Sequence, residues 1–114
     1  MGTSSIDLLQ GTLDVLILRT LAWEPMHGYG VSRFIRQRTE GVLTIESAAL
    51  YQALHRLERK KWIRAEWGLS ENNRRAKYYK LTTEGRKQLR AESSTWSAFS
   101  QAVSKVLGAT VAPA

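Results

Sequence analysis

The chain has 114 residues, enough for one compact domain with an appended helix, and its 43% hydrophobic and 24% charged residues are typical of a folded globular protein. It has no cysteine, which excludes a disulfide framework, a thiolate nucleophile and cysteine-ligated metal sites. The longest apolar stretch, from Leu13 to Ala22, carries Asp14 and Arg19 and is too short to cross a bilayer. We therefore expect a cytoplasmic protein with no cofactor, no bound metal and no membrane partner.

Positive charge is concentrated in the second half of the chain. Seventeen Lys and Arg residues against ten Asp and Glu give a formal net charge of +7 at pH 7, and twelve of these bases lie from Arg56 to Arg90 beside only four acids. A clustered excess of this kind is typical of a surface that binds a polyanion such as a nucleic acid. The alternative is a basic surface that serves only solubility.

Two helices are predicted in the first forty residues. Apolar residues at intervals of three and four predict a largely buried helix over residues 8–23. A shorter helix follows, with His27 expected near its N-terminus and Tyr29 expected in the core. After this helix, the weak alternation of residues 42–45 favours a short strand.

The third predicted helix carries the most informative surface. Ser47 can cap its N-terminus, and Leu50, Leu54 and Leu57 form a buried stripe along residues 48–61. The outward face is small at its start, polar in its middle and cationic at its end. It consists of Ala48, Ala49, Gln52, Arg56 and Arg59, with Tyr51 and His55 on its flanks.

A β-hairpin with a basic tip is predicted after the third helix. Ile63, Ala65 and Trp67 alternate with charged residues, which indicates a half-buried strand. Residues 78–81 form the returning strand, with Tyr79 and Leu81 facing inward. Between the strands, residues 68–77 combine turn-forming residues with the cations of the tip, Arg74, Arg75 and Lys77.

A last helix is predicted over residues 83–107, and residues 108–114 are expected to form a flexible tail. The apolar positions of this helix have the spacing of a coiled-coil seam: Leu89, Trp96, Phe99, Val103 and Val106. Because little of the domain is left to cover the seam, we expect it to form a dimer interface with a second copy of the chain. The alternative is that the helix folds back on the first helix as part of the core.

This order of elements predicts a mainly α fold with a small β-hairpin: a winged helix-turn-helix DNA-binding domain over residues 1–82, followed by the C-terminal dimerisation helix. The third helix fits the major groove of DNA, and the hairpin can lie along the backbone or the minor groove. Gln52 can pair with adenine through two hydrogen bonds, whereas Arg56 and Arg59 suit phosphates. The candidate DNA contacts are Ser47, Ala48, Ala49, Tyr51, Gln52, His55, Arg56, Arg59, Asn73, Arg74, Arg75 and Lys77.

Several runs of residues also resemble a known family. They are Gly11-Thr12-Leu13, His27-Gly28-Tyr29, Leu50-Tyr51-Gln52-Ala53-Leu54-His55-Arg56-Leu57-Glu58, Ile63 with Trp67-Gly68, and Arg74-Arg75-Ala76-Lys77-Tyr78-Tyr79-Lys80-Leu81-Thr82 with Gly85. These runs are similar to the PadR family of bacterial transcriptional regulators. The resemblance implies a dimeric, DNA-binding repressor whose single C-terminal helix builds the dimer. We expect such a dimer to bind a two-fold symmetric DNA operator.

The chain departs from the family pattern at the start of the third helix. The family often has Gly or Ser with Thr before the Leu-Tyr pair and Pro after it, whereas this chain has Ala48-Ala49 and Gln52. One hydroxyl contact to DNA is therefore in doubt and one candidate base reader is added, so no target sequence is carried over.

Other functions are weighed on the same residues. A winged-helix module can instead bind a protein partner without sequence-specific DNA binding, and an RNA-binding role is disfavoured because the hairpin lacks exposed aromatic pairs. No catalytic motif is found, so an enzyme is not expected. Some PadR-like regulators enclose planar ligands in the dimer, and the resemblance makes Trp96 and Phe99 candidates for lining such a site. Their alternative role is to anchor the dimer core.

Overall fold

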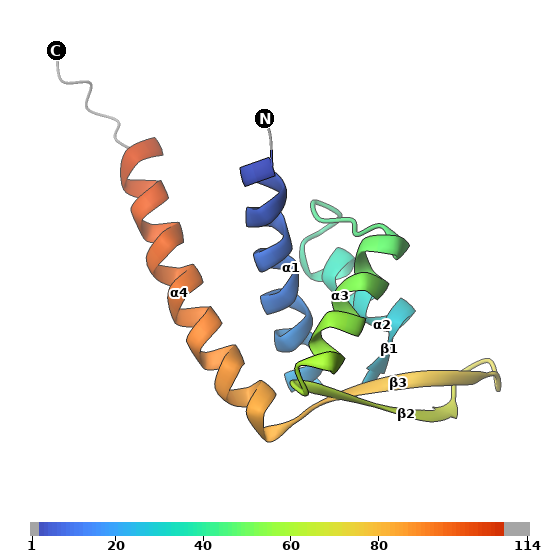
Figure 1. The fold of residues 1–114 in the computed structure, drawn as a ribbon. Helices are drawn as coiled ribbons and strands as arrows, with labels where there is room; N and C mark the ends of the chain where they lie inside the picture. The colour runs from blue at the N-terminus through green and yellow to red at the C-terminus, as the bar shows by residue number, and fades with distance from the viewer. Residues whose placement is uncertain (1–2, 109–114) are drawn as a thin grey trace, which may run out of the picture.

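The computed structural model describes residues 3–108, with side chains from residue 11 onward (Figure 1). The elements follow in the order α1 (Thr3–Trp23), β1 (Met26–His27), α2 (Gly28–Arg38), α3 (Ser47–Arg59), β2 (Ile63–Leu69), β3 (Arg75–Leu81) and α4 (Thr83–Leu107). The predicted winged helix-turn-helix with a long C-terminal helix is therefore confirmed. Of the predicted tail, only Gly108, the C-cap residue of α4, lies within the described residues.

The strands form one antiparallel sheet in the order β1-β3-β2 within the described part of the chain. β2 and β3 make the hairpin, in a register that pairs Ile63 with Leu81 at its base and Leu69 with Arg75 near its tip. β1 adds to the other side of β3, where His27 is paired with Tyr78. The hairpin is the wing of the fold, and Figure 1 shows that it extends well beyond the three-helix body.

The prediction of a strand over residues 42–45 is wrong, because these residues form a loop between α2 and α3. The Val42 amide donates to the Thr39 carbonyl oxygen at 3.0 Å, and the Leu43 amide donates to the Thr39 hydroxyl at 3.1 Å. Val42 is 80% exposed, whereas Ile45 packs against the core from the loop without joining the sheet.

The core lies where α1, α2 and α3 meet the base of the sheet. The predicted stripe of α3 is confirmed, since Leu50, Leu54 and Leu57 are buried. They pack in one cluster with Ile17 and Leu18 of α1, Val31 and Ile35 of α2, and Ile63, Tyr79 and Leu81 of the hairpin. Burial of these apolar surfaces supplies the main free energy that holds the helices to the wing.

Tyr29 was expected in the core, but it is 62% exposed. The buried positions of α2 are Gly28, Val31 and Ile35, which are spaced by three and four residues. Tyr29 is one position away from this stripe and therefore points outward, with its ring 6.3 Å from the His27 ring.

The two predicted helix starts have different outcomes. His27 is the N-cap of α2, and its Nδ1 atom accepts a 2.9 Å hydrogen bond from the Gly30 amide, which confirms its expected position. Ser47 does not cap α3: it is the first residue within the helix, and the N-cap is Glu46, whose side chain makes no capping hydrogen bond.

A tight junction joins the wing to α4. Thr82 is the N-cap of α4, and its hydroxyl accepts from the Gly85 amide at 2.9 Å and lies 2.8 Å from the Lys61 carbonyl oxygen. Gly85 is buried directly against the Trp62 carbonyl, where there is no room for a Cβ atom. This junction fixes the direction in which α4 leaves the sheet.

The first part of α4 packs on α1, and the rest of the helix leaves the body of the chain (Figure 1). Leu89 belongs to the core, whereas Val106 near the far end is 76% exposed. The folded-back arrangement weighed from the sequence therefore describes the start of α4, whereas Val106 near the end of the predicted seam stays exposed. No helix among the described residues is both long and apolar enough to span a membrane.

Candidate nucleic-acid interface

The outward face of α3 is open to solvent. Ser47, Ala48, Gln52 and Arg59 are exposed, and Ala49 is half-buried. Exposed side chains are therefore small in the first turn of α3, polar in the middle and cationic at the end, as the sequence predicts. A surface with small residues at its start permits a close approach to base edges, and Gln52 has the two hydrogen-bonding groups that an adenine edge requires.

Arg56 differs from the other members of this face. Its guanidinium pairs with the carboxylate of Asp14 on α1, and both side chains are largely buried. Arg56 lies on the side of α3 that faces α1. Its charge, which was predicted to contact a phosphate, is therefore paired with Asp14 inside the fold. The sequence contains one signal for this pair, because Asp14 is the one acid within the largely apolar stretch from Leu13 to Ala22.

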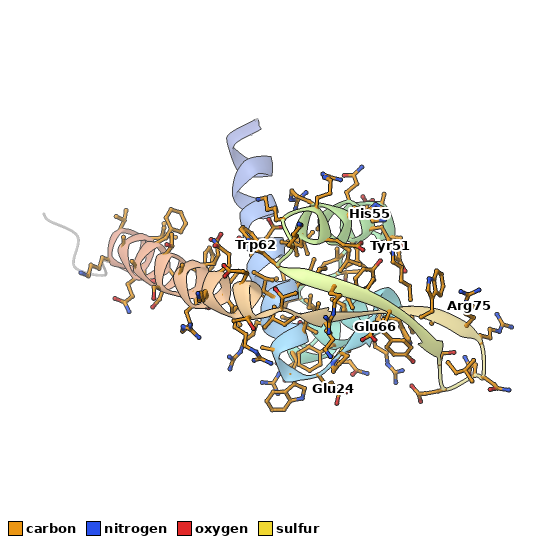
Figure 2. The ribbon with its side chains drawn as sticks, turned by 60° about the horizontal axis from the view of Figure 1, so that its bottom comes forward. Glu24, Tyr51, His55, Trp62, Glu66 and Arg75 are labelled. Carbon is orange, nitrogen blue, oxygen red and sulfur yellow. The ribbon has the colours of Figure 1, made fainter. Side chains whose placement is uncertain are left out.

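A groove of about 490 Å³ separates α3 from the wing. Tyr51 and His55 line it from α3, and Trp67, Arg75 and Lys77 line it from the wing. Figure 2 shows Tyr51 and His55 on the α3 side of the hairpin and Arg75 toward the distal end of the wing. The structure thus brings the flank of α3 and the cations of the wing to one continuous surface.

Tyr51 is held in this groove by the start of α2. A Cβ atom on residue 28 would lie 2.5 Å from the Tyr51 Oη atom, so the tyrosine ring needs a glycine at that position. The His27-Gly28-Tyr29 run therefore has a local explanation: His27 caps α2, and Gly28 makes room for Tyr51. Tyr51 remains partly exposed and lines the groove at the same time.

The cations of the wing are held by different contacts. Lys77 lies 3.7 Å from the Glu58 carboxylate of α3, which ties the wing to that helix. Arg75 stacks over the Trp67 ring, with its guanidinium carbon 4.4 Å from the ring centroid. Arg74 and Asn73 are exposed in the turn between the strands. Asn73 has a φ of 60°, a left-handed conformation that asparagine tolerates better than most residues.

Trp67 is the functional candidate that sequence reasoning missed. Its place in the alternating pattern correctly puts it on the inward face of β2, but the core ends before it and the ring is 61% exposed. The signal was available, because a large aromatic residue close to a turn that carries several cations is well placed for a cation–π contact.

Tyr79, on the inward face of β3, is buried beneath the groove, and this burial changes its pKa. Burial raises the pKa of the Tyr79 phenol above its ordinary value of 10.0, and the nearby charges of Glu58 and Tyr51 raise it further. Among the residues that the structure describes, no three His, Cys, Asp or Glu side chains gather in a way that could hold a metal ion.

Residues 17–91, more than half of the chain, match the Transcriptional regulator PadR-like family. The chain belongs to the PadR-like family of transcriptional regulators. The predicted resemblance is therefore confirmed, and the match runs from the second half of α1 through the wing to the start of α4. PadR-family transcriptional regulators are not enzymes.

Individual proteins are also similar to this chain in sequence or in structure. A protein of Lysinibacillus sphaericus described as Uncharacterized protein X is 34% identical over 91 residues, 80% of this chain and 84% of that protein. A transcriptional regulator from Clostridium thermocellum has a TM-score of 0.78 at 31% identity, over 87% of this chain and 93% of its own. A PadR family regulator from Clostridium difficile R20291 has a TM-score of 0.72 at 28% identity, over 83% and 97% of the two chains.

The PadR-like chain has a second surface on α4. The rings of Trp96 and Phe99 are 5.8 Å apart, and both line a hollow of about 220 Å³ between α1 and α4. Val103 is half-buried and Val106 is exposed farther along the predicted seam. Figure 1 shows that α4 leaves the base of the hairpin on the other side of the body from the tip of the wing.

Proposed function

We propose that this PadR-like regulator is a dimeric repressor that binds double-stranded DNA in a sequence-specific manner. The single observation that carries the proposal is the groove in which the exposed flank of α3 faces the cations of the wing. An α-helix of this size fits the major groove, and a cationic hairpin beside it can follow the neighbouring backbone or the minor groove.

The contacts divide into two roles. In the proposed complex, Gln52 reads a base edge, and Ser47, Ala48 and Ala49 allow the first turn of α3 to approach the groove closely. Phosphates are bound by Arg59 of α3 and by the turn and inner face of the wing, with Tyr51 and His55 beside the same backbone. The wing residues in this role are Asn73, Arg74, Arg75 and Lys77. Arg56 is left out of the phosphate contacts because Asp14 already neutralises it.

A second copy of the chain covers the exposed seam of α4 in the proposed dimer. Trp96, Phe99, Val103 and Val106 supply apolar surface there, and Leu89 anchors the same helix in the core of its own chain. Two copies related by a two-fold axis would present two α3 helices to the duplex. Such a dimer binds a two-fold symmetric operator, with half-sites about one helical turn apart.

The hollow between α1 and α4 suggests an effector site in this dimer. Planar aromatic compounds stack well on aromatic rings, and Trp96 and Phe99 present two rings at the edge of the hollow. We therefore include a planar aromatic effector in the proposal. Titration with a panel of such compounds should quench Trp96 fluorescence, measured as the difference between the wild type and Trp96→Phe. A panel that leaves this difference unchanged contradicts the effector site.

The DNA-binding function is tested by selecting genomic fragments with the purified protein and footprinting the sites that it retains. We expect a two-fold symmetric footprint. Gln52→Ala should lower the preference for the selected site over random duplex, whereas Arg74→Ala should weaken binding to both by a similar factor. Lys105→Ala is the matched control, because it removes a cation from α4 far from the wing.

Two outcomes contradict the proposal. If Gln52→Ala and Arg74→Ala have identical effects on selected and random duplexes, the division into base and phosphate contacts is wrong. If no duplex is bound at low salt or at about 150 mM salt, DNA binding itself is wrong, and the basic surface is better explained by an acidic protein partner.

A further inference from the structure

The inner face of the hairpin continues past the end of the core. In the register of β2 and β3, the inward pairs run from Ile63 and Leu81 through Ala65 and Tyr79 to Trp67 and Lys77, and end at Leu69 and Arg75. The first two pairs cover the helices, and the last two extend into solvent. The inward face of the hairpin is therefore buried near its base and exposed near its tip, although the residues alternate in the same way along both parts.

Trp67 is the largest side chain of the two exposed pairs, and it makes a cation–π contact with Arg75. The Arg75 guanidinium carbon lies 4.4 Å above the centre of the Trp67 ring, diagonally across the two strands. A cation stacked on an indole face at this distance is attracted by the ring quadrupole. The contact restricts a long side chain that would otherwise sample many rotamers in water.

The stacked pair is located where a DNA backbone would pass. Trp67 and Arg75 line the groove that separates the wing from α3, opposite Tyr51 and His55. The neighbouring inward cation, Lys77, is tied to Glu58 of α3 at 3.7 Å. Arg75 is therefore oriented by the wing itself, while Lys77 is oriented by the helix.

We propose that Trp67 is a positioning residue for DNA binding, which orders the Arg75 guanidinium at the wall of the groove before the duplex arrives. This inference rests on the proposed DNA-binding function and adds a role that the α3 contacts do not require. An ordered cation loses less conformational entropy on binding a phosphate, so the ring contributes to affinity through Arg75 and without a base contact of its own.

A double-mutant cycle tests this role. Affinity for a 30-base-pair duplex of mixed sequence is measured for the wild-type protein, Trp67→Ala, Arg75→Ala and the double variant, over a series of salt concentrations. We expect Trp67→Ala to weaken binding about 3- to 5-fold with an unchanged salt slope, because the charge remains. Arg75→Ala should weaken binding and lower the slope by about 0.9. In the Arg75→Ala background, removal of Trp67 should have no further effect.

Matched variants separate positioning from general damage. Trp23→Ala removes a tryptophan of similar exposure, 68%, from the end of α1 and should bind like the wild type. Trp67→Phe retains a ring and should recover most of the affinity. Trp67→Leu keeps apolar bulk but has no π face. If circular dichroism shows that Trp67→Ala does not fold, Trp67→Leu replaces it in the double-mutant cycle.

The possible results are distinct. A wild-type protein that binds no duplex contradicts the proposed DNA-binding function. A wild-type protein that binds, together with a Trp67→Ala variant that has full affinity, overturns only the positioning role. Equal losses from Trp67→Ala in the presence and absence of Arg75 also overturn it, since the ring would then act independently of that cation.

Discussion

The wing and α4 both begin in the core and both leave it, but they present opposite surfaces. The base of the wing buries Ile63 and Leu81, and the start of α4 buries Leu89. Beyond these points the wing carries Arg74, Arg75 and Lys77, whereas α4 carries a single charge, Lys105, from residue 93 to residue 107. A cationic extension suits a polyanion, and an extension with a single charge and an apolar stripe suits another apolar surface, so the difference separates the proposed DNA binding from the proposed self-association.

Both extensions begin at the junction of the hairpin with α4, so a change there should disturb both of them. Gly85→Ala places a Cβ atom against the Trp62 carbonyl, so either the hairpin or α4 must move. We expect the free energy of unfolding to fall by about 3 kcal/mol, measured by urea denaturation. Gly11→Ala in α1 is the control, because nothing lies within 4 Å of the added carbon. If both variants unfold at the same urea concentration, the junction is not rigid.

The second prediction concerns the apolar extension alone. Phe99→Asp introduces a charge into the seam of α4 and should weaken dimer association by about 100-fold or more, measured by sedimentation equilibrium. The fold of the monomer should remain, since Phe99 lies outside the buried core cluster. Val42→Asp places the same charge on an equally apolar and more exposed residue in the loop between α2 and α3. A loss of association in the Val42 variant as well would show that net charge, not the seam, controls the assembly.

The third prediction concerns α1, which contacts both α3 and α4. Asp14→Asn removes the partner of a largely buried Arg56 guanidinium and should lower the free energy of unfolding by about 2 kcal/mol. The salt slope of DNA binding should not fall, because the cation remains on α3. Glu84→Gln, which removes a carboxylate from an exposed ion pair with Lys87, is the control and should change stability little. If Asp14→Asn unfolds at the same urea concentration as the wild type, the ion pair does not hold α1 to α3.

The helices, the hairpin and the basic turn of the wing could be predicted from the sequence. Periodicity located the helices and the hairpin, because the buried stripe of α3 and the inward pair Tyr79 and Leu81 repeat at the spacing of their elements. Charge placement located the basic turn of the wing. These features depend on residues that are near in sequence, so local patterns describe them.

Other features depend on where the core ends, which no local pattern records. Trp67 follows the strand alternation but lies beyond the helices that would cover it, and Tyr29 lies one position away from the stripe of α2. The Arg56 pair with Asp14 joins residues 42 positions apart, so its geometry requires the packed α1 and α3. Ser47 was assigned to a cap because its side chain suits that role, but the helix begins one residue earlier in the structure.

The last prediction concerns the inner half of the wing and how closely it packs against the core. Because burial raises the pKa of Tyr79, the folded protein retains the phenolic proton to a higher pH than the unfolded chain does. Between the ordinary value of 10.0 and the raised value, the folded state binds more protons, so stability must fall as the pH rises through this window. Urea denaturation of the wild type and Tyr79→Phe at pH 8 and above pH 10 should show a steeper alkaline decline for the wild type. Tyr29→Phe, which removes an exposed phenol, should keep the steeper decline. Parallel curves for the wild type and Tyr79→Phe would contradict the burial of this phenol against the core.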